Sequence, residues 1–193
     1  MTPGARALFL DRDGVINVNH GYVHTRDHFD FIDGIFDACR EARALGYLLI
    51  VATNQAGIGR GYYGEADFRA LTDWMCAEFA RLGAPLDRVY FCPYHPQHGL
   101  GQYRREAPCR KPNPGMILDA ARDFRLDLTA CVLVGDKPSD IEAGERAGVG
   151  CNVLYAPAAG PQPATVPVIR HLRELAAYLR PAGPRAGIPR SAA

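Results

Sequence analysis

Short apolar runs alternate with helical patterns along this chain, and that alternation restricts the possible folds more than any other feature. Runs that are apolar on both faces suit strands buried between two layers of helices. Strands that alternate with helices form a parallel sheet through right-handed crossovers. We therefore predict a three-layer α/β fold, a Rossmann-like parallel sheet with helices on both faces. The apolar runs cover residues 7–10, 47–52, 88–91, 131–134 and 152–155, and the helical patterns cover 35–45, 65–82, 114–124 and 138–147.

Glycine and proline mark the ends of the predicted helices. Gly46, Gly83 and Gly148 follow three of the helical patterns as stop signals, and Pro114 and Pro138 suit a first helical turn. One more helix is expected on the outside of the fold.

Length and composition indicate one domain. The chain has 193 residues, of which 48% are hydrophobic, and a single domain usually has about 100–200 residues. We expect a single domain over residues 1–180 that ends with a helix at 169–179. The remaining segment, 181–193, is rich in Pro, Gly and Ala, and we expect it to be disordered.

Charge and hydropathy exclude several protein classes. The 22 basic and 21 acidic side chains give a net charge of +1, which argues against a nucleic-acid coat and an acidic tail. The sequence contains no run of about 18 apolar residues, so it predicts no membrane span. The first apolar stretch is expected to be a buried strand rather than a secretory signal.

The six cysteines of a chain without an expected secretory signal are expected to be reduced thiols. We expect a soluble, cytoplasmic monomer.

Polar side chains gather where the predicted strands end. Asp11 and Asp13 follow the first strand, Thr53 follows the second, Asp136 follows the fourth, and Lys111 opens the helix before the fourth strand. Parallel sheets place their active sites at the carboxyl ends of the strands, so these groups are expected to converge. Carboxylates, a hydroxyl and a cation suit phosphoryl transfer, which needs a nucleophile, a divalent metal and charge neutralisation.

Two aspartates spaced by one residue just beyond a strand are the strongest single signal. A carboxylate at Asp11 can act as a nucleophile and form an aspartyl-phosphate, and Asp13 can protonate the leaving group and then activate water. Asp136 would help to hold Mg²⁺, which prefers oxygen ligands. The alternative is that the Asp-x-Asp segment is only a turn, and the further polar clusters in matching positions argue against it.

Four segments resemble the motifs of the haloacid dehalogenase phosphatase superfamily: FLDRDGVIN, VATNQAGIGRG, CRKPNPGM and LVGDKPSD. The segments NHGYVHTRDHFDFIDG and EADFRALTDWM extend the resemblance to the D-glycero-D-manno-heptose-1,7-bisphosphate 7-phosphatase family, over about residues 8–154. The resemblance implies a haloacid dehalogenase-like fold without a separate cap domain. It also implies Mg²⁺-dependent removal of the C7 phosphate of a heptose bisphosphate in nucleotide-activated heptose biosynthesis. The loops expected to enclose the substrate are 18–30, 57–64 and 93–108.

The resemblance also implies a role for each matching residue. Asp11 is the nucleophile and Asp13 the general acid/base, and Thr53 and Lys111 stabilise the transferring phosphoryl group. Mg²⁺ is bound by the side chains of Asp11 and Asp136 and by the backbone carbonyl of Asp13. The partner is a small sugar bisphosphate, with no nucleic acid and no membrane. The residues implied to contact this substrate are Asn19, His20, Gly21, Tyr22, Asn54, Gln55, Ala56, Arg110 and Lys137.

The sequence departs from the family at a zinc motif. Many relatives carry Cys-x-His followed by Cys-x-Cys, and here Tyr94 and Ala107 stand at two of the four ligand positions, which leaves Cys92 and Cys109. Structural zinc takes four protein ligands, so we predict that structural zinc is absent. The one substitute ligand set has an unusual spacing and comprises Cys92, His95, His98 and Cys109.

Three other functions stay open on the sequence alone. A histidinol-phosphate phosphatase shares the Asp-x-Asp, Thr-Asn-Gln and Arg-Lys-Pro motifs, although the NHGYVH segment fits the heptose family better. A nucleic-acid end phosphatase would need a basic groove, which a net charge of +1 does not favour. A non-catalytic phosphoacceptor domain would have no use for Asp13 as an acid/base.

Overall fold

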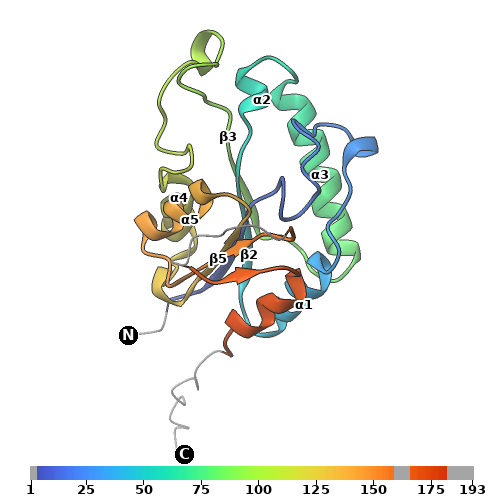
Figure 1. Ribbon diagram of the computed structural model, residues 1–193, viewed down its shortest axis with the longest axis vertical. Helices are drawn as coiled ribbons and strands as arrows, with labels where there is room; N and C mark the ends of the chain where they lie inside the picture. Colours follow the sequence, from blue (N-terminus) through green and yellow to red (C-terminus); the bar gives the residue numbers. More distant parts are fainter. Residues whose placement is uncertain (1–3, 159–165, 182–193) are drawn as a thin grey trace, which may run out of the picture.

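A six-stranded parallel sheet forms the centre of the computed structural model, which describes residues 4–158 and 166–181 (Figure 1). The strand order is β3-β2-β1-β4-β5-β6, and all neighbouring strands run parallel. This is the order of a doubly wound Rossmann sheet, so the predicted three-layer fold is confirmed. The strands are β1 (Ala7–Leu10), β2 (Leu48–Asn54), β3 (Arg88–Cys92), β4 (Val132–Gly135), β5 (Cys151–Tyr155) and β6 (Val168–Ile169).

Helices cover both faces of the sheet, with α1 and α3 on one side and α4 and α5 on the other (Figure 1). Successive residues of β1 point to opposite faces: Leu8 and Leu10 pack toward α1 and α3, whereas Phe9 packs toward α4 and α5. Both faces of this strand are therefore buried, which explains its unbroken apolar run. These helices are α1 (Ile35–Ala44), α3 (Glu65–Arg81), α4 (Gly115–Phe124) and α5 (Pro138–Ala147).

The predicted glycine stops are confirmed. Gly46, Gly83 and Gly148 have φ values of 88°, 78° and 86°, the left-handed conformation that commonly ends a helix. Pro138 begins α5 as expected, whereas Pro114 is the residue before α4 rather than part of its first turn.

The helix predicted at 169–179 is confirmed only in part, because the helix observed there is shorter and of another type. The segment contains strand β6 and then a 3-10 helix, η4 (Leu172–Tyr178). Leu172 and Leu175 of η4 are buried, and their spacing of three residues aligns side chains in a 3-10 helix as well as in an α-helix. The predicted disordered segment 181–193 lies outside the described residues, apart from Pro181.

Loops rise above the carboxyl edge of the sheet (Figure 1). They are the segment from β1 to α1, the region of α2 (Ala56–Gly59), and the connection from β3 to α4. The short helix α2 was predicted as loop, because glycine at two of its four positions lowers helix propensity. No cap domain is present among the described residues, and none of the helices there has the length and apolar character needed to traverse a bilayer. Short 3-10 turns complete the described elements: η1 (Arg26–His28), η2 (Gly101–Tyr103) and η3 (Leu128–Ala130).

Candidate active site

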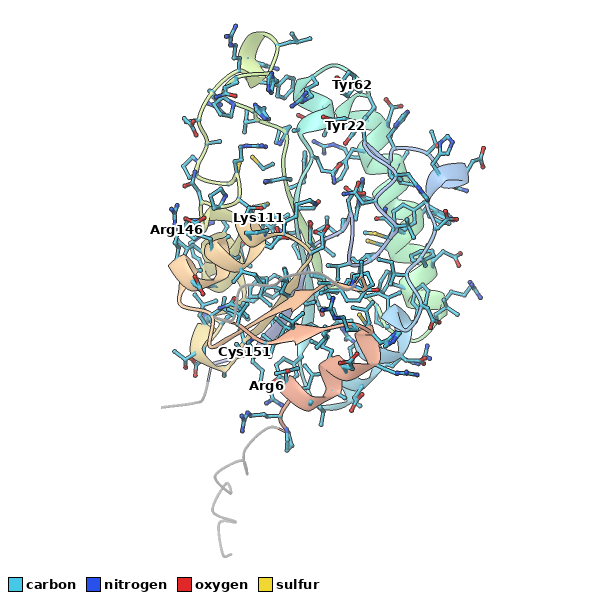
Figure 2. The ribbon with its side chains drawn as sticks, viewed as in Figure 1. Arg6, Tyr22, Tyr62, Lys111, Arg146 and Cys151 are labelled. Carbon is cyan, nitrogen blue, oxygen red and sulfur yellow. The ribbon has the colours of Figure 1, made fainter. Side chains whose placement is uncertain are left out.

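A buried lysine joins two carboxylates at the carboxyl edge of the central strands. Asp11 follows β1 directly. Lys111, labelled in Figure 2, lies in the loop before α4 and contacts Asp11. The Lys111 Nζ atom lies 2.9 Å from Asp11 Oδ1 and 2.7 Å from Asp140 Oδ1, and it donates to the Ala52 carbonyl at 2.8 Å. All three side chains are almost fully buried. A charged lysine in this position requires the carboxylates beside it.

The electrostatics of this cluster keep Asp11 deprotonated. Burial by itself would raise the pKa of Asp11, but the positive charges of Lys111 and Lys137 hold it below its ordinary value. Burial alone would lower the pKa of Lys111. The negative charges of Asp11 and Asp140 have the larger combined effect and raise this pKa above its ordinary value. Asp11 is therefore an anion at neutral pH, the form in which a carboxylate attacks phosphorus.

Three carboxylates meet beside this lysine. Oxygen atoms of Asp11, Asp136 and Asp140 all lie within 4.8 Å of one another, and in the described part of the chain this is the one such group suited to a metal ion. Burial and the charge of Asp11 raise the pKa of Asp136 to about 6. Like charges held this close repel each other unless a cation lies among them.

Lys137 shows where such a cation fits. Its Nζ atom lies 3.2 Å from Asp136 Oδ1, 3.4 Å from the backbone carbonyl of Asp13 and 3.9 Å from Asp11 Oδ2. These three oxygens are the ones predicted to bind Mg²⁺, and they converge on a single positive charge. An all-oxygen donor set is the kind that Mg²⁺ prefers, so the residues present fit this metal.

Asp140 belongs to the cluster, although we assigned it no role from the sequence. Besides its contact with Lys111, its Oδ2 accepts from the Lys137 backbone N–H at 3.0 Å at the start of α5. An aspartate in the first turn of a helix usually caps that helix. Because capping alone accounts for an aspartate at position 140, the sequence does not indicate its contact with Lys111. The signal in the sequence is its spacing of four residues from Asp136.

Asp13 is oriented by three donors. Arg12 Nη2 lies 2.9 Å from both carboxylate oxygens, Asn17 Nδ2 donates at 3.1 Å and Gln55 Nε2 at 3.0 Å. The next residue, Gly14, has a φ of +106°, and a Cβ atom there would lie 2.1 Å from Asp136 Oδ2. A side chain at position 14 would therefore displace the acidic cluster.

The end of β2 supplies Thr53, Asn54 and Gln55. Gln55 Nε2 donates to Thr53 Oγ1 at 2.9 Å, and Gln55 Oε1 accepts from the Tyr63 hydroxyl at 2.6 Å. Asn54 makes two hydrogen bonds of 3.0 Å with the backbone of Lys111, one to its carbonyl and one from its N–H. The amide of Asn54 thus holds the main chain that carries Lys111.

Most of the other predicted substrate residues lie in the two loops that follow β1 and β3. Asn19 Oδ1 accepts from the Gly21 N–H at 3.1 Å, and His20 Nε2 lies 2.7 Å from Asp30 Oδ2. The Tyr22 ring packs edge to face on Tyr62 with centroids 4.6 Å apart, near the top of the molecule in Figure 2. From the opposite loop, Arg110 Nη1 donates to the Tyr94 carbonyl at 3.1 Å. Ala56 begins α2.

Tyr63 lies in the loop 57–64 that we expected to enclose the substrate, and it contributes to the site through other side chains. It is buried, donates to Gln55, and stacks on His24 with ring centroids 5.0 Å apart. Through Gln55 it connects the segment from β1 to α1 with Asp13. Nothing in the local sequence indicates this connection, because its partners lie far along the chain.

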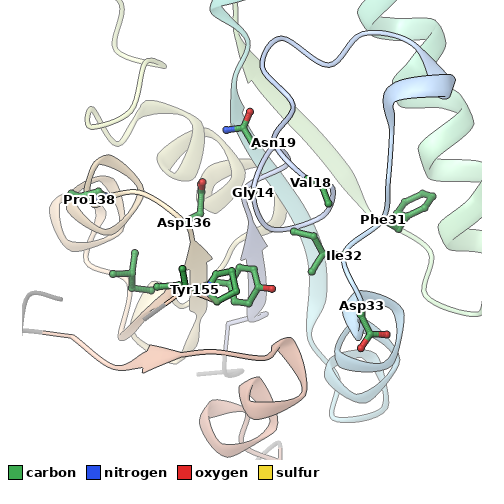
Figure 3. Close-up of a pocket in the computed structure, with 13 residues that line it drawn as sticks. Gly14, Val18, Asn19, Phe31, Ile32, Asp33, Asp136, Pro138 and Tyr155 are labelled. Atoms are coloured by element: carbon green, nitrogen blue, oxygen red, sulfur yellow. The ribbon is translucent and has the colours of Figure 1, made fainter. Parts of the chain in front are cut away.

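A cavity of about 560 Å³ opens beside the acidic cluster (Figure 3). Asp136, Gly14 and Asn19 form its polar side, and Tyr155 and Ile32 are among the apolar residues opposite. Of the acidic cluster only Asp136 lines this cavity, so the cavity adjoins the candidate site rather than enclosing it.

The two retained cysteines lie in contact. Cys109 Sγ is 2.8 Å from Cys92 Sγ, while His95 Nδ1 accepts from the backbone N–H groups of Gln97 and His98. Within residues 4–158 and 166–181, no three ligand atoms of Cys92, His95, His98 and Cys109 gather within 4.8 Å. The absence of structural zinc stays a prediction.

Comparison with known proteins places the chain in a family. A HAD-hydrolase-like family model matches residues 108–156. The D-glycero-alpha-D-manno-heptose-1,7-bisphosphate 7-phosphatase of Burkholderia mallei is 58% identical over 184 residues, covering 94% of this chain and 97% of the relative. The chain belongs to the heptose-1,7-bisphosphate 7-phosphatase family. It is a phosphoric monoester hydrolase of the haloacid dehalogenase superfamily, which confirms the resemblance found in the sequence.

Further relatives agree. The D-glycero-beta-D-manno-heptose-1,7-bisphosphate 7-phosphatase of Escherichia coli K12 is 49% identical over 154 residues, covering 80% of this chain and 81% of that protein. A HAD-like phosphatase structure from Mesorhizobium loti has a TM-score of 0.83 at 36% identity, covering 92% of this chain and 87% of that one. A D,D-heptose 1,7-bisphosphate phosphatase from B. bronchiseptica, complexed with magnesium and phosphate, has a TM-score of 0.77 at 30% identity, covering 90% and 97%.

Proposed function

We propose that this enzyme is a Mg²⁺-dependent phosphatase that removes the C7 phosphate of D-glycero-D-manno-heptose 1,7-bisphosphate through an aspartyl-phosphate intermediate. The observation that carries the chemistry is the buried, charged Asp11 carboxylate beside Lys111 and the oxygens of Asp13 and Asp136. The names of the B. mallei and E. coli relatives support the substrate. The product belongs to the biosynthesis of nucleotide-activated heptose.

Asp11 is the nucleophile. One oxygen of its carboxylate forms a bond to the phosphorus of the C7 phosphate, and the bond from phosphorus to the C7 oxygen breaks. Lys111, which contacts Asp11, and the Thr53 hydroxyl neutralise the charge of the transferring phosphoryl oxygens. Mg²⁺, held by the side chains of Asp11 and Asp136 and the Asp13 carbonyl, would supply further charge neutralisation when bound.

Asp13 is the acid and then the base. It gives its proton to the C7 oxygen as that oxygen leaves, and it then takes a proton from the water that attacks the aspartyl-phosphate. This second step releases inorganic phosphate and restores the Asp11 carboxylate. Arg12, Asn17 and Gln55 hold the Asp13 carboxylate in one orientation, so proton transfer needs little rearrangement.

The two loops at the carboxyl edge hold the sugar. Arg110 and Lys137 offer positive charge to the substrate, and Gln55 and Ala56 line the base of the site. The segment Asn19, His20, Gly21 and Tyr22 forms the wall opposite Arg110. For Asn54 the hydrogen bonds to Lys111 favour a positioning role. We propose that residues 1–180 act as one domain and that the enzyme works as a cytoplasmic monomer without nucleic-acid or membrane partners.

The test is phosphate release in the presence of Mg²⁺ from the α and β anomers of heptose 1,7-bisphosphate and from histidinol phosphate, with Asp11→Asn as the inactive control. We expect the α anomer to be preferred, because the relative that covers 94% of this chain is named for it. Preference for the β anomer would contradict only the predicted anomer preference. Turnover of histidinol phosphate but neither heptose would overturn the substrate, and activity on none would overturn the enzyme assignment.

A further inference from the structure

Two cysteines stand at the ends of the loop 93–108. Cys92 is the last residue of β3, and Cys109 follows the loop, two positions before Lys111. Their sulfur atoms are 2.8 Å apart, although the two residues lie 17 positions apart in the sequence. The fold therefore holds two thiols in contact at the base of this loop.

The two thiols differ in exposure. Cys92 is completely buried and packs with Ala52, Ala107 and Met116, whereas Cys109 lies against this apolar cluster and is partly exposed. An oxidant from solution therefore reaches Cys109 first. Cys92 is in a position to react only with a group that has already formed at Cys109.

Hydrogen bonding and charge favour the thiolate at Cys109. The hydrogen bond from the Cys92 thiol lowers the pKa of Cys109 below its ordinary value, and the charge of Arg105 acts in the same sense, whereas burial opposes both. All six cysteines lie in the described ranges, and the pKa of each of the others is raised. Cys109 is thus the cysteine most readily present as a thiolate, the form that reacts with oxidants.

We propose that Cys109 and Cys92 form a reversible disulfide when the enzyme meets a hydroperoxide, with Cys109 as the attacking thiol and Cys92 as the resolving thiol. A partly exposed thiolate beside a second thiol is the usual arrangement of a redox-sensitive pair. The disulfide would form whichever sugar phosphate the enzyme hydrolyses, because it needs only the two thiols and the oxidant.

The oxidation takes place in two steps. The Cys109 thiolate attacks one oxygen of hydrogen peroxide, the O–O bond breaks, and the hydroxide that leaves takes up a proton to become water. Cys109 is then a sulfenic acid. The Cys92 sulfur attacks the Cys109 sulfur, the S–O bond breaks, and the departing hydroxide leaves as water with the Cys92 proton. The two thiols are oxidised to one disulfide, and the peroxide is reduced to two molecules of water.

This bond would fasten the segment that carries Lys111 to the sheet. Cys92 pairs with Asn54 across β2 and β3, and Asn54 already holds the Lys111 backbone through two hydrogen bonds of 3.0 Å. Because the sulfurs are in contact before they react, the main chain has to move little, and the contact between Lys111 and Asp11 stays in place. Since a disulfide that closes a loop stabilises the fold, the oxidised enzyme should be more stable and still active.

The test treats the reduced wild type with hydrogen peroxide and counts its thiols after denaturation. We expect the free thiols to fall from six to four and to return with dithiothreitol. Tryptic digestion should yield peptide 89–104 joined to peptide 106–110, because an arginine precedes and ends each of them. The melting temperature should rise by about 5–10 °C, the shift expected from closing a loop of this length. Phosphate release from an aryl phosphate should be retained.

Three serine variants assign the roles of the two thiols. Cys92→Ser removes the resolving thiol, so Cys109 should accumulate as a sulfenic acid that dimedone traps. Cys109→Ser should keep all its thiols at the same dose of peroxide, because Cys92 is buried. Cys151→Ser is the matched control: Cys151 is also partly exposed, but burial raises its pKa, so this variant should still form the disulfide.

Other results would overturn the disulfide between Cys92 and Cys109. Six free thiols after peroxide treatment, or a joined pair of other peptides, would do so without any variant. Zinc bound to the purified wild type but not to Cys109→Ser would also do so, and it would contradict the predicted absence of structural zinc. An oxidised enzyme that melts no higher or loses activity would show that the bond displaces Lys111. No phosphate release before oxidation would overturn the proposed function and leave the thiol count unaffected.

Discussion

Replacing Asp136 with asparagine should stabilise the metal-free enzyme while it removes a proposed Mg²⁺ ligand. The pKa of Asp136 rises from its ordinary value of 3.8 to about 6, through burial and the nearby charge of Asp11. One pKa unit corresponds to about 1.36 kcal/mol, so keeping Asp136 charged in the folded protein at pH 7.5 costs about 3 kcal/mol. An asparagine oxygen can still accept from Lys137 and carries no charge, so Asp136→Asn should recover most of that cost.

The sign of the pH dependence follows from the same pKa. Between pH 3.8 and 6 the folded protein holds more protons at Asp136 than the unfolded chain does, so the stability of the wild type falls as pH rises through this window. Asp136→Asn lacks this slope. The two proteins should therefore unfold alike near pH 3.5 and differ by about 3 kcal/mol above pH 7.

Urea unfolding in EDTA, followed by the fluorescence of the single tryptophan, measures this difference. Trp74 packs on Phe29 and Phe31 and reports on the folded core. Added Mg²⁺ should reverse the order, because it stabilises the form that binds it. Asp119→Asn, at an exposed position on α4, is the control and should change stability by less than about 0.5 kcal/mol. A variant less stable than the wild type at pH 7.5 in EDTA would refute the reasoning.

Four further substitutions probe the proposed chemistry and metal site. Asp11→Asn should abolish phosphate release from an aryl phosphate, because an amide cannot act as the nucleophile. Asp13→Asn should slow release about 10²–10⁴-fold yet still bind Mg²⁺ in calorimetry. Gly14→Ala should weaken Mg²⁺ binding more than tenfold, since its Cβ atom would overlap Asp136 Oδ2. Lys137→Met should tighten Mg²⁺ binding in the same calorimetric assay, because the ammonium no longer occupies the position between the acidic oxygens.

Each of these substitutions has an outcome that would contradict it. If Asp11→Asn turns over substrate like the wild type, Asp11 is not the nucleophile. If Asp13→Asn releases phosphate at an unchanged rate, Asp13 is not the acid/base. Gly148→Ala is the control for Gly14→Ala, because Gly148 also has a positive φ but no atom within 4 Å of an added Cβ; equal effects would mean that backbone strain, not crowding, is responsible. Weaker Mg²⁺ binding by Lys137→Met would show that the ammonium does not compete with the metal.

The fold and the acidic cluster were largely predictable because their signals are local. β1 is apolar on both faces and is followed at once by Asp11. This short segment therefore predicts a strand, the burial of that strand, and the position of Asp11 at the carboxyl edge of the sheet. Asp136 repeats this arrangement after β4, which pairs with β1 in parallel. Since parallel neighbours end at the same edge, the convergence of the two carboxylates follows from the pattern.

Contacts between distant segments were not predictable in the same way. Asp140 meets Lys111 across 29 positions of sequence, and Tyr63 connects to Asp13 only through Gln55. Strand β6 has two residues and is recognisable mainly by its pairing with β5. In each case the information lies in side chains brought together by the sheet rather than in any periodicity. The roles of the site residues remain predictions for the experiments above.

The acidic oxygens come from loops after β1 and β4 at the centre of the sheet, whereas Arg110, His95 and His98 come from the loop after the edge strand β3. Random mutagenesis confined to residues 93–108 would vary the edge loop and leave the central strands intact. Such a library can be screened on an aryl phosphate for retained chemistry and on different sugar phosphates for new selectivity. The sheet thus places the residues proposed for the chemistry on its central strands and the loop to be varied on its edge strand.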